Sequence, residues 1–166
     1  MGIFTAAVSL FSNGGVGQQE KRPRGAGSSD DSEGKGTVLV IDDDPTFLEA
    51  IKLLLREAGY NVLTSSTGPK GLDMVRYAPK DVRLVLLDYN MPRFNGAETL
   101  EFLRKLNPGL KVVAVSGFRV AELPESFHRG VERFVSKPFN NDELLKTVEE
   151  VIEGTSASEA PVSAAK

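Results

Sequence analysis

Cysteine is absent from this 166-residue sequence, and His128 is its only histidine. The chain therefore forms no disulfide and offers no thiolate ligand to a metal. A single histidine also excludes a histidine-rich metal site and a catalytic network that needs several imidazoles. Any metal that this chain binds would be held by oxygen ligands, which favours Mg²⁺ over Zn²⁺.

Charge of one sign is not in large excess, and no hydrophobic run is long. Lys and Arg number 20 against 23 Asp and Glu, so the net charge of −3 gives no basic footprint for nucleic acid. No apolar run reaches the length of a membrane-spanning helix. Residues 3–11 are mildly apolar but lack the basic start and the length of a secretory signal. We therefore expect a cytoplasmic protein that has no membrane span and does not bind nucleic acid directly.

Both ends of the sequence are poor in residues that could form a core. Residues 12–36 are rich in Gly, Ser and charge, and residues 155–166 resemble them in having little to bury. Such segments cannot offset the entropy that ordering costs. The sequence therefore predicts a disordered tail over residues 1–36, one folded domain over residues 37–154, and a second disordered tail over residues 155–166.

Short hydrophobic runs recur along the predicted domain and indicate strands. Residues 38–41 are fully apolar and mostly β-branched, which is typical of a strand buried on both faces. Similar runs predict further strands over residues 62–65, 84–87 and 112–115, and one centred on Phe134 and Val135.

Helical patterns fill the intervals between these strands. Asp44 and Pro45 provide an N-cap and a first-turn proline for a helix that ends at Gly59. Other helices are predicted over residues 69–78 and 96–106, and after a cap at Asn141, while Pro124 predicts that the fourth helix is short or irregular. Five strand–helix units in succession predict an α/β fold with a doubly wound parallel sheet.

Polar side chains gather where the predicted strands end. Because the carboxyl ends of parallel strands share one edge of a sheet, these groups should converge there: Asp42, Asp43, Asp44, Asp88, Ser116 and Lys137. Two carboxylates 4 Å apart repel by about 4 kcal/mol at an effective dielectric constant near 20. Either one of them is protonated or a divalent cation neutralises them. An acidic, all-oxygen site beside a lysine suits Mg²⁺ and phosphoryl transfer, with a carboxylate as a possible nucleophile.

Four motifs carry a family resemblance. VLVIDDDP, LVLLDYNMP, VVAVSG and FVSKPF, in this order and spacing, resemble the signatures of two-component response-regulator receiver domains of the single-domain, CheY-like type. The resemblance covers 118 of the 166 residues, from Thr37 to Gly154. It implies a flavodoxin-like, five-stranded parallel sheet in the order 2-1-3-4-5 with five surrounding helices.

The resemblance also implies the chemistry of the site. Asp88 would accept a phosphoryl group from a phosphohistidine on a histidine kinase or a histidine phosphotransfer protein. The Mg²⁺ site would comprise Asp42 (through water), Asp43, Asp88 and the backbone carbonyl of Asn90. The domain would be a signalling phosphoprotein rather than an enzyme, with only self-catalysed phosphotransfer and autodephosphorylation.

Further residues have implied roles in binding and switching. Ser116 would hydrogen-bond the phosphoryl group, and Lys137 would pair with it, its bond to Pro138 being cis. Ser116 moving toward the phosphate would let the ring of Phe134 turn inward, giving a two-state switch. Phe118 departs from the family pattern and is expected to screen the phosphoryl group from water.

Several other readings of these residues remain open. Residues 42–46 also fit the D-x-D-x-T opening of haloacid-dehalogenase-type phosphatases, with Asp42 as the nucleophile, although Asp88 then has no role. A binding module that works without phosphorylation is a further alternative. Asp44 is expected to cap a helix rather than bind metal, and His128 to lie on the surface. Output is expected through a downstream protein partner, or the phosphate is passed on in a relay.

Overall fold

The computed structural model describes residues 34–77 and 81–154. They form a sheet of five parallel strands in the order β2-β1-β3-β4-β5, which confirms the expected topology. The strands are β1 Thr37–Ile41, β2 Asn61–Ser65, β3 Val82–Asp88, β4 Lys111–Ser116 and β5 Arg133–Ser136. Several are a residue or two longer than predicted, because strand pairing continues into flanking polar residues such as Asn61 and Lys111 that the apolar pattern excludes.

Helices connect the strands, and most begin at a side-chain cap. They are α1 Pro45–Glu57, α2 Gly68–Tyr77, α3 Gly96–Leu106, α4 Glu125–His128 and α5 Asn141–Glu153. Asp44 caps α1 as predicted, since its Oδ1 accepts the N–H groups of Thr46 and Phe47. The predicted cap of α5 is wrong by one residue: Asn140, not Asn141, accepts the N–H of Glu143. The predicted last residue of α2, Ala78, lies outside the described residues.

The fourth helix is short, as predicted. A 3-10 turn, η1 Val120–Glu122, precedes α4, which has only four residues. Pro124 has no N–H to donate and separates the two pieces. Among the described residues, no helix is both long enough and apolar enough to cross a membrane.

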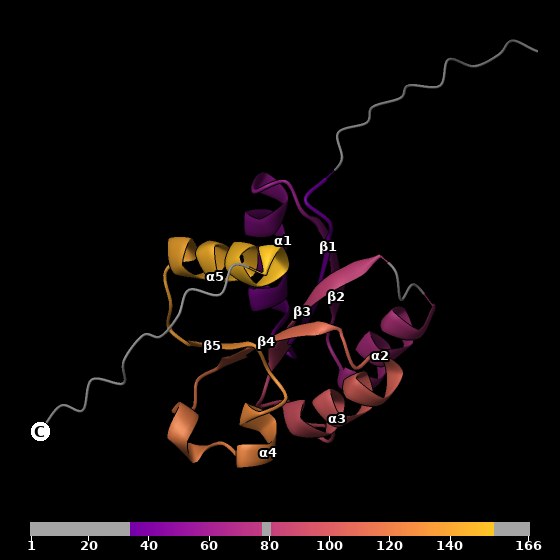
Figure 1. Cartoon of the computed structure of the whole chain (residues 1–166). Coiled ribbons are helices and arrows are strands. Elements are labelled where there is room, and N and C mark those ends of the chain that lie inside the picture. The colour runs from indigo at the N-terminus through magenta and orange to yellow at the C-terminus, as the bar shows by residue number, and fades with distance from the viewer. Residues whose placement is uncertain (1–33, 78–80, 155–166) are drawn as a thin grey trace, which may run out of the picture. The chain divides into compact units, whose positions relative to one another are not determined.

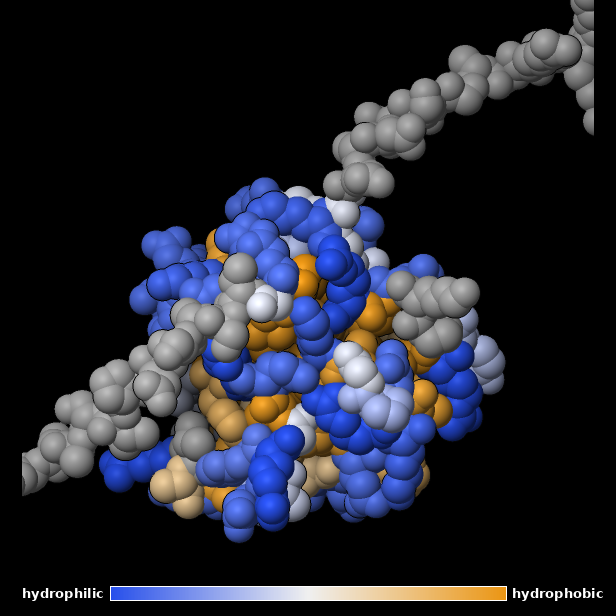
Figure 2. Space-filling view, in the orientation of Figure 1, coloured by the Kyte–Doolittle hydropathy of each residue, from blue (hydrophilic) through white to orange (hydrophobic). Residues whose placement is uncertain are grey.

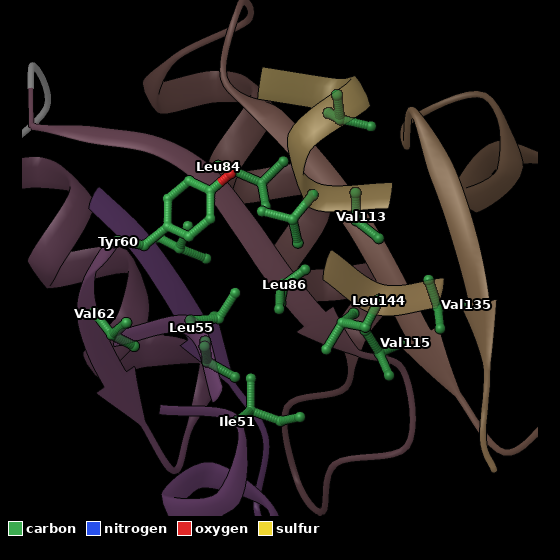
Figure 3. Close-up of a cluster of buried hydrophobic side chains, with 14 of the residues drawn as sticks. Ile51, Leu55, Tyr60, Val62, Leu84, Leu86, Val113, Val115, Val135 and Leu144 are labelled. Carbon is green, nitrogen blue, oxygen red and sulfur yellow. The ribbon is translucent and has the colours of Figure 1, made fainter. Parts of the chain in front are cut away.

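Helices cover both faces of the sheet (Figure 1). Val38 and Val40 of β1 pack with α1 and α5, whereas the alternate residues Leu39 and Ile41 pack with α2, α3 and Phe127. This division follows from the period of two along a strand, which sends successive side chains to opposite faces. Figure 3 shows the first of these clusters, in which α1 and α5 cover the same face of the sheet. The side chains of the central strands that pack against them are Leu84, Leu86, Val113 and Val115. Full burial of each such side chain contributes about 1.5–3 kcal/mol.

Contacts upstream of β1 add to the described domain. The backbone N–H of Lys35 donates to the carbonyl of Gly59, and the Lys35 ammonium pairs with Glu149 of α5 at 3.1 Å. The domain limits at residues 37 and 154 stay a prediction, because most of both tails (residues 1–33 and 155–166) lies outside the described residues.

Candidate functional site

The carboxyl ends of β1, β3 and β5 supply the three charged groups that meet at one edge of the sheet. Ile41 pairs with Leu87 in the parallel register, so Asp42, directly after β1, and Asp88, the last residue of β3, lie at the same level. Helix α3 begins close to this point, where a Cβ on Gly96 would lie 2.5 Å from the carbonyl oxygen of Asp88. Glycine is therefore required at Gly96 for α3 to start directly against the end of β3.

One lysine joins the two carboxylates. The Lys137 ammonium donates to Asp42 Oδ2 at 2.7 Å and to Asp88 Oδ1 at 3.1 Å. Asp42 is 2% exposed and Asp88 5%, whereas the Lys137 side chain is 28% exposed. Two negative charges thus share one positive charge in a buried setting, which leaves a net negative site.

Burial and charge shift the pKa values of this group in opposed ways. The pKa of Asp88 lies above its ordinary value, chiefly because burial disfavours the carboxylate and secondarily because the Asp42 charge repels it; Lys137 and the Asn90 N–H oppose this shift. For Lys137, burial lowers the pKa, but the hydrogen bonds and charges of Asp42 and Asp88 together outweigh it and raise the pKa. The ammonium is therefore held firmly charged at neutral pH.

The remaining predicted metal ligands lie around this pair. Asp43 is exposed, and Asn90 donates its backbone N–H to Asp88 Oδ2 at 2.8 Å. Asp44 is occupied as the cap of α1, and its own N–H donates to Asp42 Oδ1 at 2.9 Å. Within residues 34–77 and 81–154, no three carboxylate or histidine side chains gather closely enough to hold a metal by themselves. The buried acidic pair still offers the all-oxygen chemistry that Mg²⁺ prefers, and the Asn90 carbonyl and water would complete it.

Ser116 lies at the end of β4, next to these charges in the sheet. Its side chain is buried, and its Oγ accepts the N–H of Phe118 at 3.1 Å. Its carbonyl accepts the N–H of Lys137 at 2.8 Å, and the Lys137–Pro138 bond is cis as predicted. Phe118 is 43% exposed and packs edge-on against Tyr89, with ring centroids 6.1 Å apart.

A chain of aromatic contacts leads from this site to α4 and β5. Tyr89, the neighbour of Asp88, packs against Phe127 with centroids 5.0 Å apart, and Phe127 packs against the half-buried Phe134 at 6.1 Å. His128 packs against Phe134 at 5.1 Å. The surface position expected for His128 is wrong: the residue is half-buried, and its Nε2 is buried with no hydrogen-bond partner among the described residues.

Sequence analysis missed two aromatic residues of this site. The Lys137 ammonium lies 4.0 Å from the ring centre of Phe47, in cation–π contact, and Phe47 packs edge-on against Phe139. Phe47 reads in the sequence only as part of the apolar stripe of α1. Tyr89 gives no signal beyond its place next to Asp88, because its role depends on contacts with Phe118 and Phe127 from distant segments.

The whole arrangement has a match among known families. The model of the response regulator receiver domain matches residues 38–149, which is more than half of the chain. The chain belongs to this receiver-domain family. The haloacid-dehalogenase reading of residues 42–46 is therefore not needed to explain the acidic cluster.

The receiver domain has relatives among characterised proteins. The cell cycle transcriptional regulator CtrA of Caulobacter vibrioides is 31% identical over 116 residues, which cover 69% of this chain and 49% of that protein. The chain thus spans about half the length of the curated relatives it matches.

Solved structures agree with the fold. A response regulator receiver domain protein from Clostridium thermocellum is 26% identical with a TM-score of 0.67, covering 72% of this chain and 96% of its own. The response regulator TrrA from Thermotoga maritima, solved in complex with Mg²⁺-BeF, is 28% identical with a TM-score of 0.62, covering 70% and 98%. The doubly wound receiver fold is therefore shared by this chain.

Proposed function

We propose that this receiver domain accepts a phosphoryl group on Asp88 from a phosphohistidine of a histidine kinase or a histidine phosphotransfer protein in the cytoplasm. The observation that carries the proposal is the contact of one ammonium, that of Lys137, with two buried carboxylates, Asp42 and Asp88. A structural ion pair needs only one carboxylate. Burying a second one costs free energy that a purely structural role would not explain.

In the proposed reaction, a carboxylate oxygen of Asp88 attacks the phosphorus of the phosphohistidine. An oxygen–phosphorus bond forms, the nitrogen–phosphorus bond breaks, and the imidazole leaves with the electron pair. Lys137 is positioned to donate to the incoming phosphoryl oxygens, and the N–H of Asn90 holds the carboxylate in place. Ser116, next to Val115, which pairs with Asp88, supplies a hydroxyl for another phosphoryl oxygen.

The acidic residues fit a divalent cation. Asp42, Asp43, Asp88 and the carbonyl of Asn90 would hold Mg²⁺, which supplies positive charge against the charge of the phosphoryl group. Asp42 and Asp88 are already buried at the sheet edge, while the exposed Asp43 is free to turn toward the ion. This assignment accords with the Mg²⁺-BeF complex of the TrrA relative.

The signal would leave the site through the rings beside it. When the Ser116 side chain moves toward the phosphoryl group to donate to it, its Oγ leaves the Phe118 N–H, and Phe134 has room to turn inward. Phe134 contacts Phe127 and His128, so its movement would reposition α4. A downstream protein then binds the surface that the movement of α4 has changed, or the phosphoryl group is passed to a second histidine.

Intact-mass spectrometry tests the proposal. The full chain is incubated with acetyl phosphate and Mg²⁺, or with EDTA, in parallel with Asp88→Asn. One added phosphoryl group that requires both Mg²⁺ and Asp88 is the expected result. A wild-type chain that gains no mass would refute the proposal and favour a phosphorylation-independent binding module. A modification that persists in Asp88→Asn but disappears in Asp42→Asn would instead favour Asp42 as the nucleophile.

A further inference from the structure

A cleft of about 770 Å³ lies between α3 and the segment of residues 124–130, which contains α4. Its volume falls within the range of sites that hold small molecules or side chains. Residues of both segments and the start of the loop after β3 line it, among them Tyr89, Ala97, Glu98, Leu100, Ser126 and Phe127. In the face shown in Figure 2, hydrophilic residues predominate and hydrophobic ones appear mainly in the recesses between them.

The cleft follows from the short fourth helix. A four-residue helix rises only about 6 Å, whereas the eleven residues of α3 rise about 16 Å. Helix α4 can therefore cover only part of α3. At one end the two segments are in close contact, since a Cβ on Gly130 would lie 2.6 Å from Leu100. Beside this contact, Ala97, Glu98 and Glu101 on the same flank of α3 stay open to the cleft.

The floor of the cleft is apolar and adjoins the proposed phosphorylation site. Leu100 and Phe127 are almost fully buried beneath it, and Ala97 and the ring of Tyr89 flank them. Tyr89 and Phe127 also belong to the chain of ring contacts that joins Phe118 to Phe134. A side chain seated in the cleft would touch the rings that adjoin Asp88 and Phe134.

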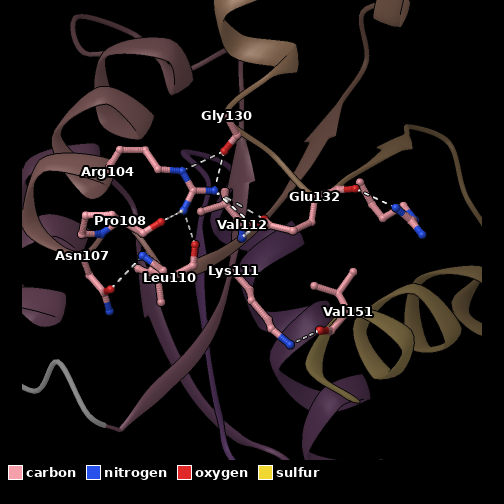
Figure 4. Close-up of polar contacts among 11 residues, drawn as sticks. Arg104, Asn107, Pro108, Leu110, Lys111, Val112, Gly130, Glu132 and Val151 are labelled. Carbon is pink, nitrogen blue, oxygen red and sulfur yellow. Dashed lines mark hydrogen bonds and ion pairs between the residues drawn. The ribbon is translucent and has the colours of Figure 1, made fainter. Parts of the chain in front are cut away.

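The cationic groups around the cleft are already engaged. The Arg104 guanidinium donates to the carbonyls of Gly130, Leu110 and Pro108 and pairs with Glu132 (Figure 4). Lys105, on the same helix, pairs with Glu101 at 2.7 Å. Both cations therefore already have partners within the chain.

Glu98 is the exception among the charged groups that line the cleft. Its carboxylate accepts only the backbone N–H of Asn95, at 2.9 Å, as part of the capping box of α3. No Lys, Arg or His of the described residues lies within ion-pair distance of it. The charge that the cleft offers to a ligand is therefore negative, beside an apolar floor.

We propose that this cleft docks a protein partner that inserts an aromatic or large aliphatic side chain and places a neighbouring Lys or Arg against Glu98. This inference rests on the proposed function, because the partner would be the downstream protein to which the receiver domain signals. Docking itself does not require phosphorylation. The partner segment is basic and amphipathic, because apolar contacts and one complementary charge are what the cleft provides.

Phage-displayed random 12-residue peptides, selected against the full unphosphorylated chain, provide the probe. The expected peptides carry an aromatic or Leu residue next to Arg or Lys. A synthetic copy of the most enriched peptide should shift the backbone amide signals of Ala97 and Gly130 in NMR spectra of the labelled chain. Peptides that lack basic residues, shifts confined to other surfaces, or no enrichment at all would overturn the proposal.

Two variants separate the effect of the Glu98 charge from the role of this residue in the capping box of α3. Glu98→Gln keeps a capping-box residue, since Gln serves at that position as Glu does, but removes the charge. It should weaken peptide binding about tenfold at low salt, which corresponds to about 1.4 kcal/mol. Glu57→Gln removes the same charge from the end of α1, on the opposite face of the sheet, and should leave the affinity unchanged. Equal effects of the two variants would show that Glu98 is not the partner group.

A peptide variant completes a thermodynamic cycle. Replacing the peptide's basic residue by Gln should cost about tenfold on the wild-type chain and nothing further on Glu98→Gln. Additive losses would overturn the pairing. Light scattering detects the other occupant, a second copy of the chain: a dimer that Glu98→Gln dissociates would replace the proposed partner. Mass spectrometry after acetyl phosphate treatment reports phosphorylation separately, so failure of docking and failure of the proposed function are distinguishable.

Discussion

Replacing Lys137 by Met tests the central electrostatic feature of the domain, because it removes the charge and keeps the apolar stem. Each contact of the ammonium, at 2.7 Å to Asp42 and 3.1 Å to Asp88, has a gross Coulomb energy of about 5–6 kcal/mol at an effective dielectric constant of 20. Most of this gross energy offsets the desolvation of the three charges. Removing one partner of a buried ion pair typically costs about 3–5 kcal/mol. Lys137 is partly exposed, so we expect about 3 kcal/mol at pH 7.

The physical reason for this cost is the repulsion between Asp42 and Asp88, which is no longer offset once the Lys137 ammonium is removed. The two carboxylate oxygen atoms both contact the Lys137 nitrogen, so they lie no more than about 6 Å apart. At that distance or less, and again at a dielectric constant of 20, the two carboxylates repel by at least about 3 kcal/mol. The variant can relieve this repulsion by protonating Asp88, whose pKa burial already raises in the wild-type chain. Loss of Lys137 removes an opposing influence and raises that pKa further.

The loss of unfolding free energy in Lys137→Met, relative to wild type, should therefore decrease as the pH falls. In the variant, folded Asp88 binds a proton more readily than unfolded Asp does, so the folded state gains stability relative to the unfolded state as the pH falls through the raised pKa. Urea unfolding at pH 8, 7, 6 and 5 should show the difference from wild type shrinking toward low pH. Mg²⁺ should also shrink this difference at neutral pH, since the variant's site has lost the Lys137 charge and should bind the cation more tightly than wild type, and a ligand of the folded state stabilises that state.

Lys52→Met is the matched control. The Lys52 side chain is 26% exposed, close to the 28% of Lys137, but it pairs with a single exposed carboxylate, that of Glu49. Such a surface pair contributes about 0.2–1 kcal/mol. If Lys137→Met costs no more than Lys52→Met, or if its deficit is the same at every pH, the reasoning about a shared buried charge is refuted.

Three further results are expected. Asp88→Asn should raise the free energy of unfolding by about 1 kcal/mol at pH 7 without Mg²⁺, as measured in urea, because one charge of a like-charged buried pair is removed; a less stable variant would contradict this. Phe118→Ala should shorten the lifetime of the phosphoryl group severalfold in a mass-spectrometric time course, whereas Phe102→Ala, at a residue of similar exposure (45% against 43%), should not change it. Arg104→Lys should lower the free energy of unfolding by about 2 kcal/mol, because an ammonium cannot reach the several carbonyls that the planar guanidinium binds.

The positions of the strands and most helix limits could be predicted because local chemistry decides them, whereas the order of the strands in the sheet was implied only by the family resemblance. The apolar run of β1 and the Asp44–Pro45 start of α1 each have one good structural solution. The start of α5 shows where this fails. Asn140 and Asn141 are equally good caps in sequence, and only the position of the chain after β5 decides that Asn140 reaches the N–H of Glu143.

The site was predicted as a set of residues but not as a geometry. Asp42, through water, and Asp43, more directly, were both expected to hold the metal, yet neighbouring residues at a strand end point to opposite sides. One is therefore buried against Lys137, and the other is exposed. The environments of Tyr89 and His128 depend on ring contacts between segments far apart in sequence, which no local pattern records.

The charges of Asp42, Asp88 and Lys137 explain why the site favours binding of a cation and why it lowers the stability of the folded domain. Lys137 supplies one positive charge to two buried negative ones, so any ligand that brings further positive charge is favoured there. A phosphoryl group on Asp88 brings negative charge and shifts the balance the other way, which makes both Lys137 and a divalent cation more strongly required. A better-compensated site, such as the one that Asp88→Asn creates, would be more stable but would have no reason to change when a phosphoryl group is offered. The uncompensated negative charge is therefore the property on which the proposed switching would depend.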